Sequence, residues 1–147
     1  MEGSSNKLTN LNVHGNKDAG VQLSNGVANN TLTSVYSYSN ADSTGENADG
    51  FAIKLHSGTG NKLISCTAEG NTGAVFDRNN QNGVVTMTGC TATNNTGGNY
   101  QWPLTGTPST LGYKVTFAKA IITNCTSSGG GSNDLTGATV TNSPTVK

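Results

Sequence analysis

Three stretches of the chain align without a gap: NKLTNLNVHGN (6–16), NTLTSVYSYSN (30–40) and NKLISCTAEGN (61–71). Two later stretches, VTMTGCTATNN (85–95) and AIITNCTSSGG (120–130), keep the same pattern, the second of them loosely. Two apolar columns run down this alignment, the first made of Leu8, Leu32, Leu63, Met87 and Ile122, and the second of Leu11, Val35, Cys66, Cys90 and Cys125.

The spacing of these repeats indicates the fold. Positions 11, 35, 66, 90 and 125 are separated by 24, 31, 24 and 35 residues. A basic period of 24 with insertions is too short for a pair of helices and fits one coil of a β-solenoid. One coil cannot bury its own apolar face, so the coils must stack to form the core. We therefore expect an all-β, right-handed parallel β-helix of about five coils.

The composition favours strands and turns. The 147 residues include 20 Asn, 22 Thr and 20 Gly, and only 11% are charged, with a net charge of zero. Asn, Thr and Gly are poor helix formers, while Thr suits strands and Asn and Gly suit turns. Disordered chains usually carry net charge and lack β-branched residues, so an ordered chain is favoured. The length indicates one domain, residues 1–147, as a complete short form or as a fragment of a longer β-helix.

A polar column closes each repeat. Asn16, Asn40, Asn71 and Asn95 share this position, and Gly130 ends the run. In a stack with strands about 4.8 Å apart, such side-chain amides form a hydrogen-bonded ladder.

A second strand is expected after each of these Asn residues, at 20–23, 50–53, 75–78 and 99–102. Strand alternation directs one column inward and its neighbour outward. The inward column is Val21, Phe51, Phe76 and Tyr100, and the outward one is Gln22, Ala52, Asp77 and Gln101.

An insertion, ADSTGENAD (41–49), lengthens the approach to the second of these strands. Insertions of this kind usually decorate the binding face of a solenoid. It brings Asp42, Glu46 and Asp49 toward the edge where Asp18 lies one coil earlier. Like charges so placed repel, and a cation between them relieves the repulsion. An all-oxygen set favours Ca²⁺ over zinc or copper. The alternative is that these are ordinary turn acids.

The remaining features exclude several classes of protein. A near-neutral chain lacks the basic face that nucleic-acid binding needs. No stretch of about 18 apolar residues could span a membrane, and none behind Met1 resembles a signal peptide. The three cysteines share one column and are expected to be buried free thiols. His14 and His56 fit no zinc motif and are expected at the surface.

The run GENADGFAIKL (45–55), followed by GTGN (58–61) and SCTAEGN (65–71), resembles the parallel β-helix pectate lyases of polysaccharide lyase family 9. DAGVQL (18–23) and FDRNNQNGVVTMTGCTATNN (76–95) share the resemblance, which covers roughly residues 4–102. It implies a secreted enzyme that cleaves pectate or a related uronan by Ca²⁺-assisted β-elimination. It also implies that Asp49 and Asp18 hold the metal, with Asp42 and Glu46 matching less closely.

In one respect the chain departs from this family. The resemblance implies a catalytic lysine one coil beyond ADGFA, but no lysine lies between Lys62 and Lys114. Arg78 occupies that neighbourhood, and Lys54 follows the preceding strand. Each is a candidate base or a binder of uronate carboxylates, since arginine resists deprotonation and lysine titrates more readily. Asp77 and Gln101 are further candidate substrate-binding residues.

Other functions stay open on the sequence alone. A non-catalytic carbohydrate-binding module would use the Thr-rich faces, and a structural stalk would not need the acids. Ice binding is disfavoured because Thr does not form one outward column through every coil. An uncapped first coil would expose strand edges, so self-association is a further expectation.

Overall fold

The computed structural model describes residues 1, 3–23, 27–42, 48–53, 59–73, 76–78, 84–101, 105–106, 115–116 and 119–147. For strand residues 53, 76–78, 101, 105–106, 115–116 and 119 only the backbone is described. Within this part of the chain the regular structure is entirely β, and no helix long and apolar enough to cross a membrane occurs.

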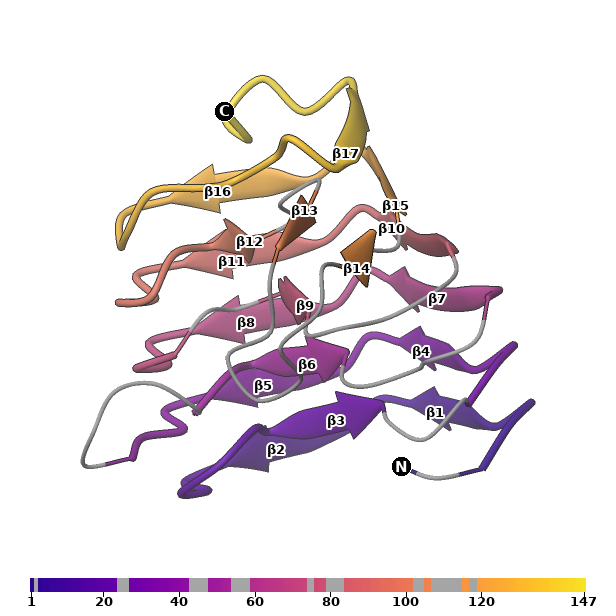
Figure 1. Cartoon of the computed structure of the whole chain (residues 1–147). Helices are drawn as coiled ribbons and strands as arrows, with labels where there is room; N and C mark the ends of the chain where they lie inside the picture. The colour runs from indigo at the N-terminus through magenta and orange to yellow at the C-terminus, as the bar shows by residue number, and fades with distance from the viewer. Residues whose placement is uncertain are drawn as a thin grey trace.

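The strands form three parallel sheets that the chain visits in turn, one strand per sheet per coil (Figure 1). Sheet A contains β1 (Lys7–Thr9), β4 (Thr31–Thr33), β7 (Asn61–Ile64), β10 (Val84–Thr88), β15 (Lys119–Thr123) and β17 (Ala138–Thr141). Sheet B contains β2 (Asn12–His14), β5 (Tyr36–Tyr38), β8 (Thr67–Glu69), β11 (Thr91–Thr93) and β16 (Thr126–Ser128). Sheet C contains β3 (Val21–Leu23), β6 (Phe51–Ile53), β9 (Phe76–Arg78) and β12 (Tyr100–Gln101). A two-stranded antiparallel pair, β13 (Thr105–Gly106) with β14 (Val115–Thr116), lies between β12 and β15 in the chain.

This architecture is a parallel β-helix, as the repeat predicts. The first apolar column is in register through sheet A, from Leu8 opposite Leu32 to Met87 opposite Ile122. Leu32, Leu63, Met87 and Ile122 have at most 1% of their surface exposed. Sheet A also has a sixth strand, β17, in a stretch where the repeat alignment indicated no coil.

Each repeat that was aligned as one segment divides into two strands on different sheets. The division falls at a residue with a left-handed backbone, such as Asn10 (φ 56°) or Ser34 (φ 53°). Only Gly, Asn, Asp and a few small polar residues adopt this conformation at low cost. The corner that follows each strand of sheet A therefore has a sequence signature: Asn10, Ser34, Ser65, Gly89, Asn124 and Asn142.

The predicted Asn ladder is confirmed. The side-chain amide of Asn40 donates to Oδ1 of Asn71 at 2.8 Å, and that of Asn71 donates to Oδ1 of Asn95 at 2.9 Å. The ladder ends at Gly130 for a steric reason, because a Cβ there would lie 2.3 Å from the carbonyl oxygen of Asn95.

A second amide ladder runs along the corner before sheet A. Oδ1 of Asn61 accepts from both the backbone and the side chain of Asn30, and Oδ1 of Asn30 accepts from the backbone of Asn6. These residues open each of the first three aligned repeats, so the signal was present in the alignment.

The cysteines and the sheet C column complete the core. All three cysteines are free and buried, as expected, whereas Leu11, which shares their column in the first coil, is exposed. The register of sheet C places Phe51 opposite both Val21 and Phe76, and Tyr100 opposite Phe76. The Tyr100 hydroxyl donates to the carbonyl of Thr126 at 3.1 Å. Burial raises the pKa of this phenol, so the donor stays protonated.

Candidate functional site

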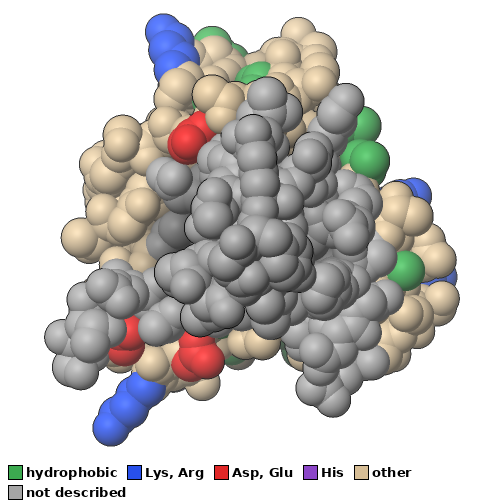
Figure 2. Space-filling view, viewed as in Figure 1, with side chains coloured by type: hydrophobic (Ala, Val, Ile, Leu, Met, Phe, Trp, Pro, Cys, Tyr) green, Lys and Arg blue, Asp and Glu red, His purple; other side chains and the backbone are tan. Residues whose placement is uncertain are grey.

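The acids singled out in the sequence lie where the chain enters sheet C. Two backbone hydrogen bonds join the first two coils here, from Gly20 N to the carbonyl of Asp49 at 2.8 Å and from Val21 N to that of Gly50 at 3.1 Å. Asp18 and Asp49 therefore stand on adjacent coils, beside the starts of β3 and β6. Figure 2 shows acidic side chains on this face at the end of the stack where β3 lies.

Asp49 is buried, with 2% of its surface exposed. Its carboxylate reaches toward the third coil, where Gly73 N donates to the carbonyl of Ala48 at 3.1 Å. A Cβ added at Gly73 would lie 2.5 Å from Oδ1 of Asp49 and 2.9 Å from the carbonyl carbon of Ala48. Gly73 thus leaves the space that the carboxylate occupies. Burying an ionised carboxylate is costly unless donors or a cation compensate its charge.

Asp18 and Asp42 have different surroundings. Asp18 is exposed, and its Oδ1 accepts the backbone N–H of Ala19 at 2.8 Å. Asp42 is half-buried, and its backbone N–H donates to the Thr72 hydroxyl at 3.3 Å. Among the described residues no three carboxylate, imidazole or thiol groups are close enough to hold a metal ion. Glu46, the fourth predicted ligand, lies outside the described residues.

The donor set fits calcium in part. Carboxylate oxygens are the ligands that Ca²⁺ prefers, and Gly73 leaves room for the carboxylate of Asp49. The backbone carbonyl of Asp49 accepts from Gly20 N, which fixes the residue to the first coil.

A small polar network fixes the approach to β6, and sequence reasoning missed it. The Ser37 hydroxyl donates to the carbonyl of Gly50 at 2.8 Å and accepts from the Asn40 side chain at 3.1 Å. A Cβ at Gly20 would lie 2.1 Å from the Ser37 oxygen. Ser37 occupies the inward position of YSY (36–38) and is fully buried. A polar residue at an inward strand position was the signal that could have revealed it.

Two of the predicted substrate-binding residues, Asp77 and Gln101, lie on the outward register of sheet C, the column of Gln22. Asp77 pairs with Ala52 on one side and with Gln101 on the other. Arg78 pairs with Ile53, which in turn pairs with the buried Leu23, so the register of Arg78 is not the outward one. The side chains of Asp77, Arg78 and Gln101, and all of Lys54 and His56, lie outside the described residues. Ala52 is 1% exposed, so its outward register does not make it a surface residue.

Known proteins similar to this chain share its parallel β-helix architecture. The family model described as "Pel9A-like, right handed beta helix region" matches residues 1–146. Pectate lyase L of Paenibacillus polymyxa (strain SC2) is 43% identical over a 76-residue alignment that covers 45% of this chain and 17% of that protein. Pectate lyase L of Dickeya dadantii (strain 3937) is 36% identical over 77 residues, covering 51% of this chain and 18% of that protein.

A solved structure supports the fold. The crystal structure of pectate lyase Pel9A superposes with a TM-score of 0.55 at 22% identity, covering 95% of this chain and 48% of that one. The chain therefore spans less than a fifth of the length of these two curated relatives and about half of the solved one. The match over residues 1–146 also establishes the right-handed coil: this chain belongs to the Pel9A-like right-handed β-helix family.

Proposed function

We propose that this chain carries part or all of a calcium-dependent pectate lyase, which cleaves polygalacturonate or a related uronan by β-elimination. The burial of the Asp49 carboxylate is the observation that carries the proposal. Asp49 is a buried carboxylate at the entry to sheet C, adjacent to the coil of Asp18, in a chain of the Pel9A-like family. Asp49 and Asp18 would hold Ca²⁺, with Asp42 and Glu46 contributing from the insertion.

The chemistry explains why such a site needs both acids and a base. β-Elimination removes the proton at C5 of a uronate, which is α to a carboxylate and only weakly acidic. Bound calcium would neutralise that carboxylate and stabilise the negative charge that develops as the proton leaves. The chain itself must supply a base, and Lys54 and Arg78 are the candidates. Asp77 and Gln101, on adjacent strands of the same outward register, would contact neighbouring sugar units.

A polymeric substrate too large to enter a cell also supports an extracellular location, so we propose that the protein is secreted. The alternative function is a non-catalytic module that binds the same acidic polysaccharide. The assay that separates them mixes the chain with polygalacturonate and Ca²⁺ and follows the ultraviolet absorbance of the unsaturated product. A lyase produces a steady rise, whereas a binding module retains the polymer without a rise.

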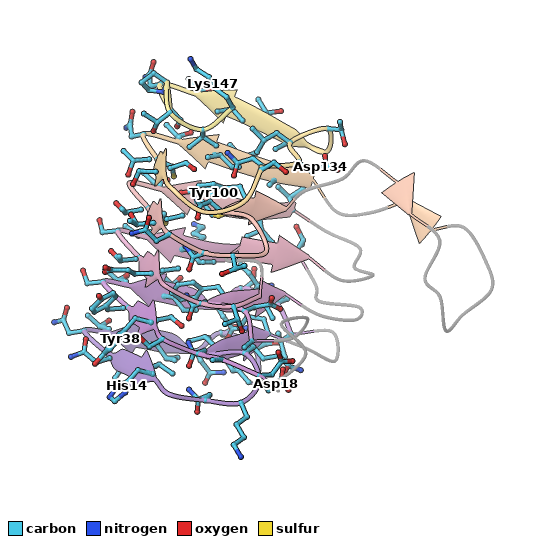
Figure 3. All side chains as sticks on the ribbon, turned by 90° about the vertical axis from the view of Figure 1, so that its left-hand side faces the viewer. His14, Asp18, Tyr38, Tyr100, Asp134 and Lys147 are labelled. Atoms are coloured by element: carbon cyan, nitrogen blue, oxygen red, sulfur yellow. The ribbon has the colours of Figure 1, made fainter. Side chains whose placement is uncertain are left out.

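The metal site is tested by calorimetric titration with CaCl₂. We expect Asp49→Asn to weaken Ca²⁺ binding by about tenfold or more, because one charged ligand is lost. Asp134→Asn is the matched control, since Asp134 lies at the other end of the stack (Figure 3). The two hydrogen bonds that Oδ1 of Asp134 accepts from Thr136 survive in the amide. Equal Ca²⁺ affinity in both variants would contradict the assignment.

Replacing the two candidate bases identifies the one that acts. A base acts chiefly in the transition state, so its loss lowers kcat with little change in KM. Loss of a residue that only binds uronate raises KM instead. We expect one of Lys54→Ala and Arg78→Ala to abolish turnover and the other to weaken binding.

A further inference from the structure

A stack of aromatic rings lies on sheet B. The rings of Tyr36 and Tyr38, both on β5, stack with centroids 4.4 Å apart and an interplanar angle of 26°. Tyr38 also stacks on His14 of β2, with centroids 4.7 Å apart and an angle of 20°. Figure 3 places His14 and Tyr38 on the opposite side of the stack from Asp18. The ring stack is therefore separate from the candidate calcium site.

Tyr36, at one end of this stack, is held on two sides. Tyr38 covers one face of its ring, and its hydroxyl donates to Oε2 of Glu69 at 2.5 Å. The hydrogen bond to Glu69, with a smaller contribution from burial, raises the pKa of this phenol to about 12. The ring is thus neutral and oriented before any ligand arrives, which lowers the entropy cost of binding.

A groove of about 320 Å³ lies beside this ring, at the corner between sheets A and B. The corner turns through Ser34 and Ser65, whose left-handed backbones (φ 53° and 51°) place small side chains at the surface of adjacent coils. Tyr38 lies two residues after Tyr36 on β5, and Ser34 lies two residues before it, in the corner. Tyr36 is itself one of the residues that line the groove. The lining consists of Ser34, Val35, Tyr36, Ser65 and Thr67.

We propose that this groove binds a neutral pyranose ring of a saccharide chain. The apolar C–H face of a pyranose matches the aromatic ring of Tyr36 in the lining, as apolar groups pack on aromatic rings. The hydroxyls of Ser34, Ser65 and Thr67 both donate and accept, so they complement sugar hydroxyls, which do the same. Val35 lies beneath the groove and is fully buried, so the sugar would contact the exposed side chains around it.

Charge selects a neutral sugar over an acidic one. The five described lining residues carry no charge, and Glu69 places a carboxylate on the Tyr36 hydroxyl. An acidic sugar in the groove would approach this carboxylate without a lining cation to offset the repulsion. The groove therefore differs in ligand class from the calcium site, and it stands whether or not the chain cleaves pectate. It would hold a neutral chain or branch that accompanies the acidic polymer.

The test is a titration of the ¹⁵N-labelled chain with cellotetraose, galactotetraose and trigalacturonate, followed by amide chemical shifts. We expect at least one neutral tetrasaccharide to shift the amides of Ser34, Tyr36, Ser65 and Thr67 in the millimolar range. Trigalacturonate should leave them in place. Tyr36→Ala should lower the affinity about tenfold, the usual contribution of one aromatic contact.

Two control variants make the result specific. Tyr36→Phe keeps the ring and loses only the hydroxyl, so it should retain most of the affinity. Asp49→Asn alters the candidate calcium site and should leave the neutral saccharide bound as before. The proposal is overturned if neither neutral tetrasaccharide shifts these amides, if Tyr36→Ala binds like the wild type with its other signals unchanged, or if trigalacturonate binds here equally well.

Discussion

The interior of the Asn ladder should contribute far more to stability than its end, and Asn71→Ala tests this. Asn71 is 1% exposed and its side chain makes four hydrogen bonds. Oδ1 accepts from the backbone N–H of Asn40 at 3.1 Å and from the Asn40 amide at 2.8 Å. The Asn71 amide donates to Oδ1 of Asn95 at 2.9 Å and to the carbonyl of Ser37 at 3.3 Å.

The magnitude follows from what the substitution leaves behind. Alanine would leave the buried backbone N–H of Asn40 without this acceptor, which costs about 1–3 kcal/mol. Each of the other three bonds contributes roughly 0.5–1.5 kcal/mol net, and losses within one network do not simply add. We therefore expect Asn71→Ala to lower the free energy of unfolding by about 3–5 kcal/mol.

Asn16 provides the matched control at the exposed end of the same ladder. Its amide donates to Oδ1 of Asn40 at 2.9 Å and weakly to the carbonyl of His14 at 3.4 Å. Because water replaces these bonds at an exposed site, Asn16→Ala should cost only about 0.5–1 kcal/mol.

Urea unfolding of both variants, monitored by circular dichroism and extrapolated to zero denaturant, measures the difference. Equal losses, or a loss below about 1 kcal/mol for Asn71→Ala, would refute the view that the ladder stabilises the stack. Asn71→Asp offers an independent check. It keeps the shape but turns an acceptor toward Oδ1 of Asn95, so it should destabilise at least as much.

Three further predictions concern the site, the surface and the core. Gly73→Ala retains every proposed ligand but should weaken Ca²⁺ binding measured by calorimetry, because the added Cβ would displace the Asp49 carboxylate. Unchanged Ca²⁺ affinity would show that the carboxylate does not depend on the space that Gly73 leaves. Spectrophotometric titration should find Tyr36 ionising near pH 12. The contribution of its hydrogen bond to Glu69 to the free energy of unfolding should be intact below pH 10 and lost as the pH rises through 12. Glu69→Gln should move the ionisation of Tyr36 toward pH 10. The three buried thiols should resist a thiol reagent in the native protein and all react in denaturant, so fast labelling of the native chain would contradict their burial.

Several parts of this structure could be predicted from the sequence, because they depend on the repeat or on local backbone preferences. Strand alternation and a repeat near 24 residues predicted the apolar columns, and the register of sheet A matches them from Leu8 to Ile122. The Asn ladder followed because identical side chains stacked one strand apart must meet. The left-handed corners are also visible in the sequence as Gly, Asn or Ser, since only a few residue types tolerate that backbone conformation.

Other parts depended on how coils of unequal length pack. Asp49 was expected as an edge ligand, and its near-complete burial depends on Gly73, 24 residues later, leaving it room. Ala52 shares the outward register of Gln22 and is nevertheless buried, which alternation alone does not predict.

By itself, the sequence determined the parallel coil, its inward columns and the ladder, because each is repeated at positions that the alignment superposes. The groove beside Tyr36 was decided only by the tertiary structure. It joins Ser34 to Ser65 across an interval of 31 residues, beside a Tyr36 ring that is held by a stack with Tyr38 and a hydrogen bond to Glu69. The orientation of the Tyr36 ring is set by one neighbour on its own strand and one on the next coil, and the period of the repeat carries no information about such contacts.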